Sequence, residues 1–344
     1  MATIKDVAEL AGVSITTVSH VINETRYVSD ELKDKVFHAM KELEYRPNTL
    51  ARGLRSGKTK TIGLIIPDIS NPFFAEYSRK IEDRGFEYGY NVVLCNSDEN
   101  PAKELLYIDL LLSKQVDGLM IFLTGNNLNI RHHLINGDIP IVVTDREPKG
   151  VNTDVVLIDN FKGGYNATQY LLSLNHRRIG CISGPSLIRP SAQRVEGYLT
   201  ALEDAEIPID EDLIRLGDFR VEGGEKEMSH LMKISDPPTA VFVCNDMMAL
   251  GAMRAIQSKG KSVPDDFSIV GFDNTPITKL VYPQLTTISQ PIQEMAELAV
   301  ELLIEKIKLK EDNKHKKALK PHYKRRILDT ELIVRGSCAE LKKV

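Results

Sequence analysis

The sequence predicts a small all-α segment at the N-terminus, followed by an α/β core built from two parallel sheets. Three observations predict this fold class. The length of 344 residues exceeds one ordinary domain of about 100 to 200 residues. The first 45 residues carry apolar side chains at helical spacing. From residue 60 onward, short apolar runs alternate with amphipathic stretches in two successive series, as in parallel sheets with helical crossovers.

The composition is typical of a soluble globular protein. Hydrophobic residues make up 42% and charged residues 27% of the sequence. No segment approaches the roughly twenty consecutive apolar residues of a membrane helix. The sequence begins MATIKDVAEL, without the basic and apolar pattern of a signal peptide. We therefore expect a cytoplasmic protein.

The sequence shows no motif of an enzyme or of a metal site. Cys95, Cys181, Cys244 and Cys338 have no CxxC spacing, and the first three lie in apolar runs, so we expect reduced thiols in a core. There is no GxSxG motif, no P-loop and no histidine cluster with metal-ligand spacing. We therefore expect no enzymatic activity, no catalytic residue, no metal ligand and no cofactor.

Three short helices are predicted within residues 1–45. The first follows Thr3 as its N-cap, the second follows Ser14 after a turn at Gly12, and the third begins near Asp30. Their apolar residues at helical spacing are Ile4, Val7, Ala8 and Leu10, then Val18, Val21 and Ile22, then Leu32, Val36, Met40 and Leu43. Two helices joined by a turn with glycine are typical of a helix-turn-helix that reads the major groove of DNA.

The second helix leaves small polar residues facing outward, which alone is equally compatible with a solvated surface. However, the run TIKDVAELAGVSITTVSHVIN resembles the helix-turn-helix of the lactose/galactose repressor family almost position for position. The resemblance implies a DNA-binding transcriptional repressor in which Ile15, Thr16 and His20 read base edges. It implies phosphate contacts from Thr17, Ser19, Asn23 and Tyr27. The expected DNA-binding set also includes Thr3, Ser14 and Arg26.

Residues 46–59 are predicted to form a basic hinge. The net charge of the chain is −4, yet no Asp or Glu lies from Tyr45 to Pro67, where five Arg and Lys residues fall within fifteen positions. The run PNTLARGLRSGK is too short and too rich in glycine for a stable free helix. It resembles the hinge helix of the same family, whose paired copies wedge a leucine into the minor groove. The resemblance assigns the wedge to Leu54 and supporting contacts to Ala51, Arg52 and Arg55. A core position for Leu54 is the alternative.

The core is expected to contain two Rossmann-like subdomains, with a break in the pattern between the two series. Ligands of such sheets bind beyond the carboxyl ends of the strands. The polar residues that follow the predicted strands include Asp68, Asn96 and Asp246. Carboxylates and amides bridge neighbouring hydroxyl groups, arginine donates hydrogen bonds, and phenyl rings cover the apolar faces of a sugar. Each residue alone is compatible with a helix cap or a solvated loop.

The core resembles the periplasmic sugar-binding proteins, and the chain as a whole is most similar to the ribose-operon repressor type within the family. The resemblance covers residues 1 to about 338. It implies a monosaccharide effector such as ribose. The residues it assigns to the effector are Asn71, Phe73, Phe74, Asp145, Arg146, Arg194, Phe219, Asn245, Asp273 and Gln290.

The chain is expected to divide into four parts. These are a headpiece at 1–45, a hinge at 46–59, a first core subdomain at 60–161 with 292–322, and a second at 162–291 with 323–340. The Lys-rich stretch from Lys306 to Arg326 is interpreted as a solvated loop.

The resemblance implies a homodimer that binds a pseudo-palindromic operator of about 16 to 20 base pairs. Effector binding is expected to close the cleft, separate the hinge segments and release the DNA. Two alternatives are a catabolite-control regulator whose co-effector is a phosphorylated carrier protein, and a purine-responsive repressor. An enzyme and a periplasmic transport receptor are the rivals outside transcription.

Overall fold

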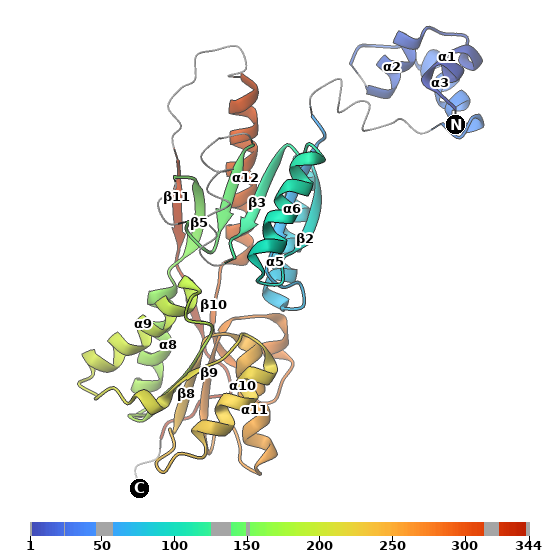
Figure 1. Ribbon diagram of the computed structural model, residues 1–344. Helices are drawn as coiled ribbons and strands as arrows, with labels where there is room; N and C mark the ends of the chain where they lie inside the picture. The colour runs from blue at the N-terminus through green and yellow to red at the C-terminus, as the bar shows by residue number, and fades with distance from the viewer. Residues whose placement is uncertain are drawn as a thin grey trace. The chain divides into compact units, whose positions relative to one another are not determined.

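The computed structural model of the protein describes residues 2–23, 25–45, 58–124, 139–148, 152–312 and 323–341. The chain forms two units, Met1–Thr59 and Lys60–Val344. Each unit has a hydrophobic core of its own. Figure 1 shows the two units, with the three helices of the first in dark blue.

The described residues of the first unit form three helices at the three predicted positions. They are α1 (Ile4–Ala11), α2 (Ile15–Asn23) and α3 (Asp30–Glu42). Gly12 has φ 63° at the end of α1, where a residue without Cβ fits the left-handed turn. The Ser14 hydroxyl accepts a hydrogen bond from the Thr17 backbone at 3.0 Å and so caps α2. Val7, Val18 and Val36 are fully buried between the helices. The helix-turn-helix prediction is confirmed.

The second unit contains two six-stranded sheets, which confirms the predicted α/β core. The strand order of the first sheet is β11-β5-β4-β3-β1-β2, all parallel. Its strands are β1 (Thr61–Ile66), β2 (Asn91–Asn96), β3 (Gly118–Phe122), β4 (Ile141–Thr144), β5 (Asp154–Ile158) and β11 (Arg325–Leu328). Helices α5 (Pro72–Glu87), α6 (Pro101–Ser113) and α12 (Ile292–Asp312) pack on this sheet (Figure 1).

The strand order of the second sheet is β12-β10-β9-β8-β6-β7, parallel except for β12. Its strands are β6 (Ile179–Ser183), β7 (Ile214–Leu216), β8 (Ala240–Val243), β9 (Ser268–Asp273), β10 (Thr286–Ser289) and β12 (Glu331–Ile333). The helices of this subdomain are α8 (Asn160–Ser173), α9 (Arg189–Asp204), α10 (Val221–Leu231) and α11 (Asp246–Ser258), with 3-10 turns η1 (Glu211–Leu213) and η2 (Pro276–Lys279).

The chain passes between the two sheets three times, after β5, after β10 and after β11. One predicted boundary is wrong, because residues 325–328 belong to the first subdomain and not to the second. Arg325 to Leu328 pair in parallel with Val155 to Ile158. The stretch from Lys306 to Arg326 is also not a loop at its two ends, since Lys306 lies in α12 and Arg325 and Arg326 in β11.

The break expected between the two series contains β5 and α8. The helix pattern of α8 is weak because Gly163 and Gly164 lie side by side in its first half. The structure gives the reason for Gly164, since a Cβ atom there would lie 2.1 Å from the backbone oxygen of Arg194. A Cβ atom at Gly197 of α9 would likewise lie 2.2 Å from the backbone oxygen of Phe161. Close packing of α8 on α9 therefore requires residues that weaken the sequence signal.

Candidate functional site

In the first unit, the outward face of α2 is a candidate DNA-reading surface. Ile15 is 44% exposed and Thr16 is exposed, while Ser19 and His20 are partly buried. The helix contains no acidic residue. Its amino end, where backbone N–H groups are free, favours contact with phosphate. The side chain of Tyr27, after α2, is 90% exposed.

Hydrogen bonds hold several predicted DNA-contacting side chains in place. The Ser14 and Thr17 hydroxyl oxygens lie 2.8 Å apart. The Asn23 side-chain amide donates to the Ser19 backbone oxygen at 2.7 Å. His20 Nδ1 lies 2.7 Å from the Thr25 hydroxyl, so Nε2 is the ring nitrogen able to contact a base.

The other predicted DNA contacts are less direct or lie outside the described residues. Thr3 is the N-cap of α1, and its hydroxyl and backbone N–H both donate to the Asp6 carboxylate, at 2.9 and 2.7 Å. Arg26 is exposed. The hinge residues Ala51, Arg52, Leu54 and Arg55 lie outside the described residues.

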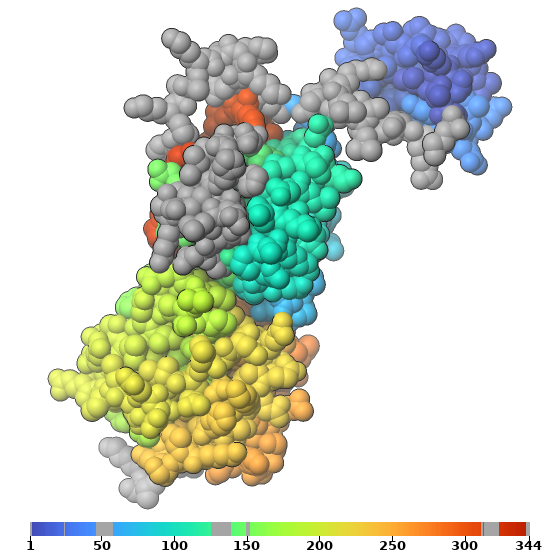
Figure 2. All heavy atoms as spheres, viewed as in Figure 1, coloured from blue at the N-terminus to red at the C-terminus, as the bar shows by residue number. Residues whose placement is uncertain are grey.

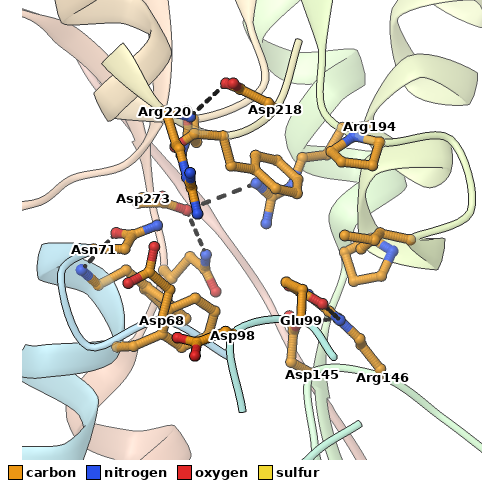
Figure 3. Close-up of a pocket in the computed structure, with 18 residues that line it drawn as sticks. Asp68, Asn71, Asp98, Glu99, Asp145, Arg146, Arg194, Asp218, Arg220 and Asp273 are labelled. Atoms are coloured by element: carbon orange, nitrogen blue, oxygen red, sulfur yellow. Dashed lines mark hydrogen bonds and ion pairs between the residues drawn. The ribbon is translucent and has the colours of Figure 1, made fainter. Parts of the chain in front are cut away.

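The second unit has a cavity between its two subdomains, and all ten residues assigned to an effector line it. The space among its lining residues is about 760 Å³, including the space open to solvent. Figure 3 shows polar side chains from both subdomains directed into this space. The full lining consists of Asp68, Asn71, Phe73, Phe74, Asp98, Glu99, Asp145, Arg146, Pro185, Ile188, Pro190, Arg194, Asp218, Phe219, Arg220, Asn245, Asp273 and Gln290.

Nearly every polar residue of the lining directly follows a strand, as expected for open parallel sheets. The sequence prediction missed Asp98 and Glu99 after β2, and Asp218 and Arg220 after β7. The same rule would have found them, because each lies within four residues of its strand. Two residues named as strand-end candidates lie behind the cavity instead. Asn96 accepts from Ile69 N at 2.6 Å, and Asp246 accepts from Thr275 N at 2.7 Å.

Five lining residues other than glycine have positive φ. The values are 55° for Asp98, 53° for Glu99, 67° for Asp145, 66° for Phe219 and 115° for Asp273. Such backbone conformations cost free energy and persist only where the surroundings hold them. Their concentration at the strand ends aims these side chains into the cavity.

Arg146 is fixed by carboxylates of its own subdomain. Its two terminal nitrogens donate to Glu99 at 2.8 and 2.7 Å, and one also donates to the Leu123 oxygen at 2.8 Å. Its Nε lies 3.5 Å from Asp145 Oδ2 and has no hydrogen-bond partner. Burial raises the pKa of the Asp145 carboxyl, although Arg146 and Arg194 act against this.

Arg194 is the cation of the second subdomain. It lies in the second turn of α9. Its Nε donates to Asn160 at 2.8 Å and one terminal nitrogen donates to the Cys244 oxygen at 2.6 Å. The guanidinium lies 3.6 Å from the centre of the Phe272 ring and 3.7 Å from Asp273 Oδ1. Stacking and hydrogen bonds together orient it towards the cavity.

Asp273 and Gln290 form a buried pair at the base of the cavity. The Gln290 amide donates to Asp273 Oδ1 at 2.7 Å, while Gln290 Oε1 is buried without a partner. Burial raises the pKa of Asp273 to about 8, and the carboxylates of Asp246 and Asp145 add to this, whereas Arg194 opposes it. An unpaired buried acceptor is costly, so Gln290 is ready to accept from a ligand.

Phe73 and Phe74 belong to an aromatic cluster with Tyr77 and Phe122. The ring of Phe122 meets those of Phe74 and Tyr77 edge to face, with centroids 5.2 and 4.8 Å apart. Phe73 and Phe74 are 4% and 9% exposed, so the cluster forms one apolar wall. Phe219 of the opposite subdomain is more exposed.

Asn71 and Asn245 also cap helices. The Asn71 side chain accepts from Phe73 N at 3.0 Å at the start of α5. The Asn245 side chain accepts from Met248 N at 2.9 Å and donates to the Phe219 oxygen at 3.0 Å. Asn245 therefore contributes to the cavity mainly by holding Phe219.

The described residues contain neither a candidate metal site nor a helix that could span a membrane. No group of three His, Cys, Asp or Glu side chains among them could hold a metal ion. Within the same ranges, no helix has the length and apolar character needed to cross a membrane. The polar side chains that line the cavity can form hydrogen bonds with a small polar ligand.

Comparison with known proteins matches both units. Residues 3–48 match the model of bacterial regulatory proteins of the lacI family, and residues 168–338 match that of a periplasmic binding protein-like domain. The chain is 39% identical to the HTH-type transcriptional repressor PurR of Mannheimia succiniciproducens over 99% of this chain and 100% of that protein. It is 42% identical to the HTH-type transcriptional regulator DegA of Bacillus subtilis over 85% and 88%.

Solved structures give the same result. The lac repressor dimer bound to operator and the anti-inducer ONPF is 28% identical, with a TM-score of 0.85 over 98% of this chain and 99% of that one. A complex of the regulator CelR with cellobiose is 31% identical, with a TM-score of 0.73 over 98% and 100%. A LacI family regulator from Enterococcus faecium with bound ribose is 32% identical, with a TM-score of 0.73 over 82% and 100%.

Proposed function

The chain belongs to the lacI family of transcriptional regulators, which are not enzymes, and we propose that it represses a carbohydrate-utilisation operon until a monosaccharide such as ribose releases it from operator DNA. One observation carries the sugar proposal. The ten side chains assigned to the effector come from strand ends and helices of both subdomains, and they line a single cavity. Their carboxylates, amides and guanidiniums match the hydroxyl groups of a sugar in kind.

Two polar atoms of the lining support a hydroxyl ligand in particular. Gln290 Oε1 and Arg146 Nε are both buried without a hydrogen-bond partner, and the first needs a donor while the second needs an acceptor. A hydroxyl group supplies both. The solved relatives with ribose and with cellobiose bind sugars, which agrees with this assignment.

We propose that the protein acts on DNA as a homodimer through α2 and the hinge. The exposed apolar side chains of the second unit offer surfaces for a second copy. Tyr282 and Leu280, after β9, are 91% and 82% exposed. On the first subdomain, α6 exposes Leu106 and Leu110, and Figure 2 shows this helix in teal on the surface.

The proposed mechanism is closure of the second unit around the sugar. A ligand bound by Asp145 and Arg146 on one side and by Arg194 and Asp273 on the other draws the subdomains together. The three connecting segments permit such a movement without unfolding either sheet. Closure then separates the hinge segments of the dimer and weakens operator binding. A coupling free energy of about 1 to 3 kcal/mol is typical, and the operator must weaken sugar binding by the same factor.

Calorimetric titration of the full-length protein with pentoses, hexoses and purines tests the effector. We expect one free monosaccharide to bind most tightly. Purines prefer flat faces on both sides, and of the three phenyl rings in the lining only Phe219 is not mostly buried. A purine that binds more tightly than every sugar would replace this proposal with the purine-responsive one.

Binding to an operator selected from random DNA, with and without the sugar, tests the proposed release from DNA. We expect a pseudo-palindromic site of about 16 to 20 base pairs whose affinity falls when the sugar is added. Affinity that rises on adding the sugar would refute release. A response that requires a phosphorylated carrier protein, with no effect of sugar, would favour catabolite control.

A further inference from the structure

The charge of the cavity narrows the chemical class of the effector. Six carboxylates and three guanidiniums line the cavity, which is a formal excess of three negative charges. The carboxylates are Asp68, Asp98, Glu99, Asp145, Asp218 and Asp273, and the cations are Arg146, Arg194 and Arg220. Because burial raises the pKa of Asp273 to about 8, protonation there removes one of these charges near pH 7.

Both inner cations already have hydrogen-bond partners within the protein. Glu99 binds Arg146 through both of its oxygens, at 2.7 and 2.8 Å. Arg194 is engaged by Asn160 and the Cys244 oxygen, and Asp273 lies 3.7 Å away. A phosphate or carboxylate group on a ligand would have to displace these partners and then lie beside the carboxylates it had released.

The third cation, Arg220, lies near acidic side chains of the cavity lining. Figure 3 shows its side chain extending from the second subdomain towards the side of Asp68 and Asp98. Asp98 has a lowered pKa, mainly through its hydrogen bond with Lys103, and Arg220 adds to the shift. The backbone N–H of Arg220 donates to Asp218 at 2.9 Å. The Arg220 guanidinium therefore lies within electrostatic range of Asp98, whose carboxylate also pairs with Lys103.

The inner polar atoms also favour hydroxyl groups. Gln290 Oε1 is a buried acceptor without a partner, and it needs a donor from the ligand. Hydroxyl groups donate and accept, whereas the oxygens of an ionised phosphate mainly accept. A like charge placed beside buried carboxylates is strongly unfavourable.

From this charge balance, we propose that the cavity takes an uncharged, unphosphorylated monosaccharide and rejects sugar phosphates and sugar acids, with Asp68, Asp98 and Glu99 as the discriminating groups of the first subdomain. The inference rests on the proposed function, since it concerns the same cavity. The protein would then sense the free sugar, which is the substrate of a sugar kinase. It would not sense the sugar phosphate that such a kinase produces.

The test compares D-ribose, D-ribose 5-phosphate and 5-O-methyl-D-ribose by calorimetry on the full-length protein, at about 0.05 M and 0.5 M salt. D-glucose and its 6-phosphate form a second pair. We expect the phosphate to bind at least about tenfold more weakly than the free sugar and the methyl ether at low salt. High salt should narrow the gap, because it screens repulsion at the exposed mouth.

The variant Asp98→Asn should reduce the discrimination severalfold. Asparagine suits the φ of 55° at this position, so the loop conformation is retained. The matched control is Asp265→Asn, an equal charge change at an exposed residue outside the cavity lining, which should leave discrimination unchanged.

Two results would overturn the inference while leaving the proposed function in place. One is a phosphate that binds as tightly as the free sugar at low salt. The other is a methyl ether that binds as weakly as the phosphate, which would make size and not charge the cause. Failure of every free sugar to bind would instead remove the proposed function, and this inference with it.

Discussion

Replacing Asp273 by Asn should change how the stability of the core depends on pH. The pKa of Asp273 is raised by burial from an ordinary value of 3.8 to about 8. The folded state therefore holds a proton that the unfolded state releases near pH 4. The stabilisation of the folded state by this proton is fully present below pH 4 and is lost as pH rises through 8.

The magnitude follows from the two pKa values. At pH 5 the raised pKa favours the folded state by about 4 kcal/mol, and by pH 9 almost all of this is gone, since each pKa unit corresponds to about 1.36 kcal/mol. Asparagine keeps an acceptor for the Gln290 amide, which donates to Asp273 Oδ1 at 2.7 Å. Asp273→Asn should thus remove the pH-dependent part while keeping this hydrogen bond.

The assay is urea unfolding of the full-length protein at pH 5, 7 and 9. The measured quantity is the free energy of unfolding of Asp273→Asn minus that of the unmodified protein. We expect this difference to increase by about 4 kcal/mol between pH 5 and pH 9. Asp145 and Asp246 also have raised pKa values, so the comparison with the unmodified protein is needed to obtain the part of the pH dependence that requires Asp273. Parallel curves for the two proteins would show that Asp273 ionises freely in the folded state and would refute the reasoning.

Three further predictions concern the reader, the cavity and the packing behind it. His20→Ala should relax discrimination at one base pair by about 1 to 3 kcal/mol in binding assays on operator variants, whereas a uniform loss over all sequences would make His20 a phosphate contact. Arg194→Ala should abolish the response of operator binding to sugar and lower stability by about 1 to 3 kcal/mol, because the Asn160 and Cys244 oxygens lose their buried hydrogen-bond donor; a normal sugar response would contradict this. Gly164→Ala should lower the melting temperature of the core and weaken sugar binding, because its Cβ would lie 2.1 Å from the Arg194 oxygen and must displace α9; unchanged values for both would show that α8 and α9 separate easily.

Much of the fold was predictable because the local signals agree with the tertiary structure. The caps at Thr3 and Ser14, the turn at Gly12 and the buried valines of the first unit all act over a few residues. The ten side chains that the resemblance assigned to the effector line one cavity, and most of them follow strands, because parallel strands direct their carboxyl ends to one edge.

What the sequence failed to predict depends on distant contacts. Helix α8 was missed because Gly164 serves packing against α9 and not helix formation. The strand β11 was placed in the wrong subdomain because its partner is β5, about 170 positions earlier. The pairing of Arg146 with Glu99 likewise joins residues from two strand ends, and no local pattern indicates it.

The interleaving of the two sheets has a consequence for biosynthesis. Strand β11 completes one edge of the first sheet, and β12 completes an edge of the second, within the last twenty residues of the chain. Neither sheet is whole until these residues have left the ribosome, whereas the three helices of the first unit have their own core from the beginning. A nascent chain thus acquires its DNA reader long before its sensor, so a truncated product would carry the reader without a complete sensor.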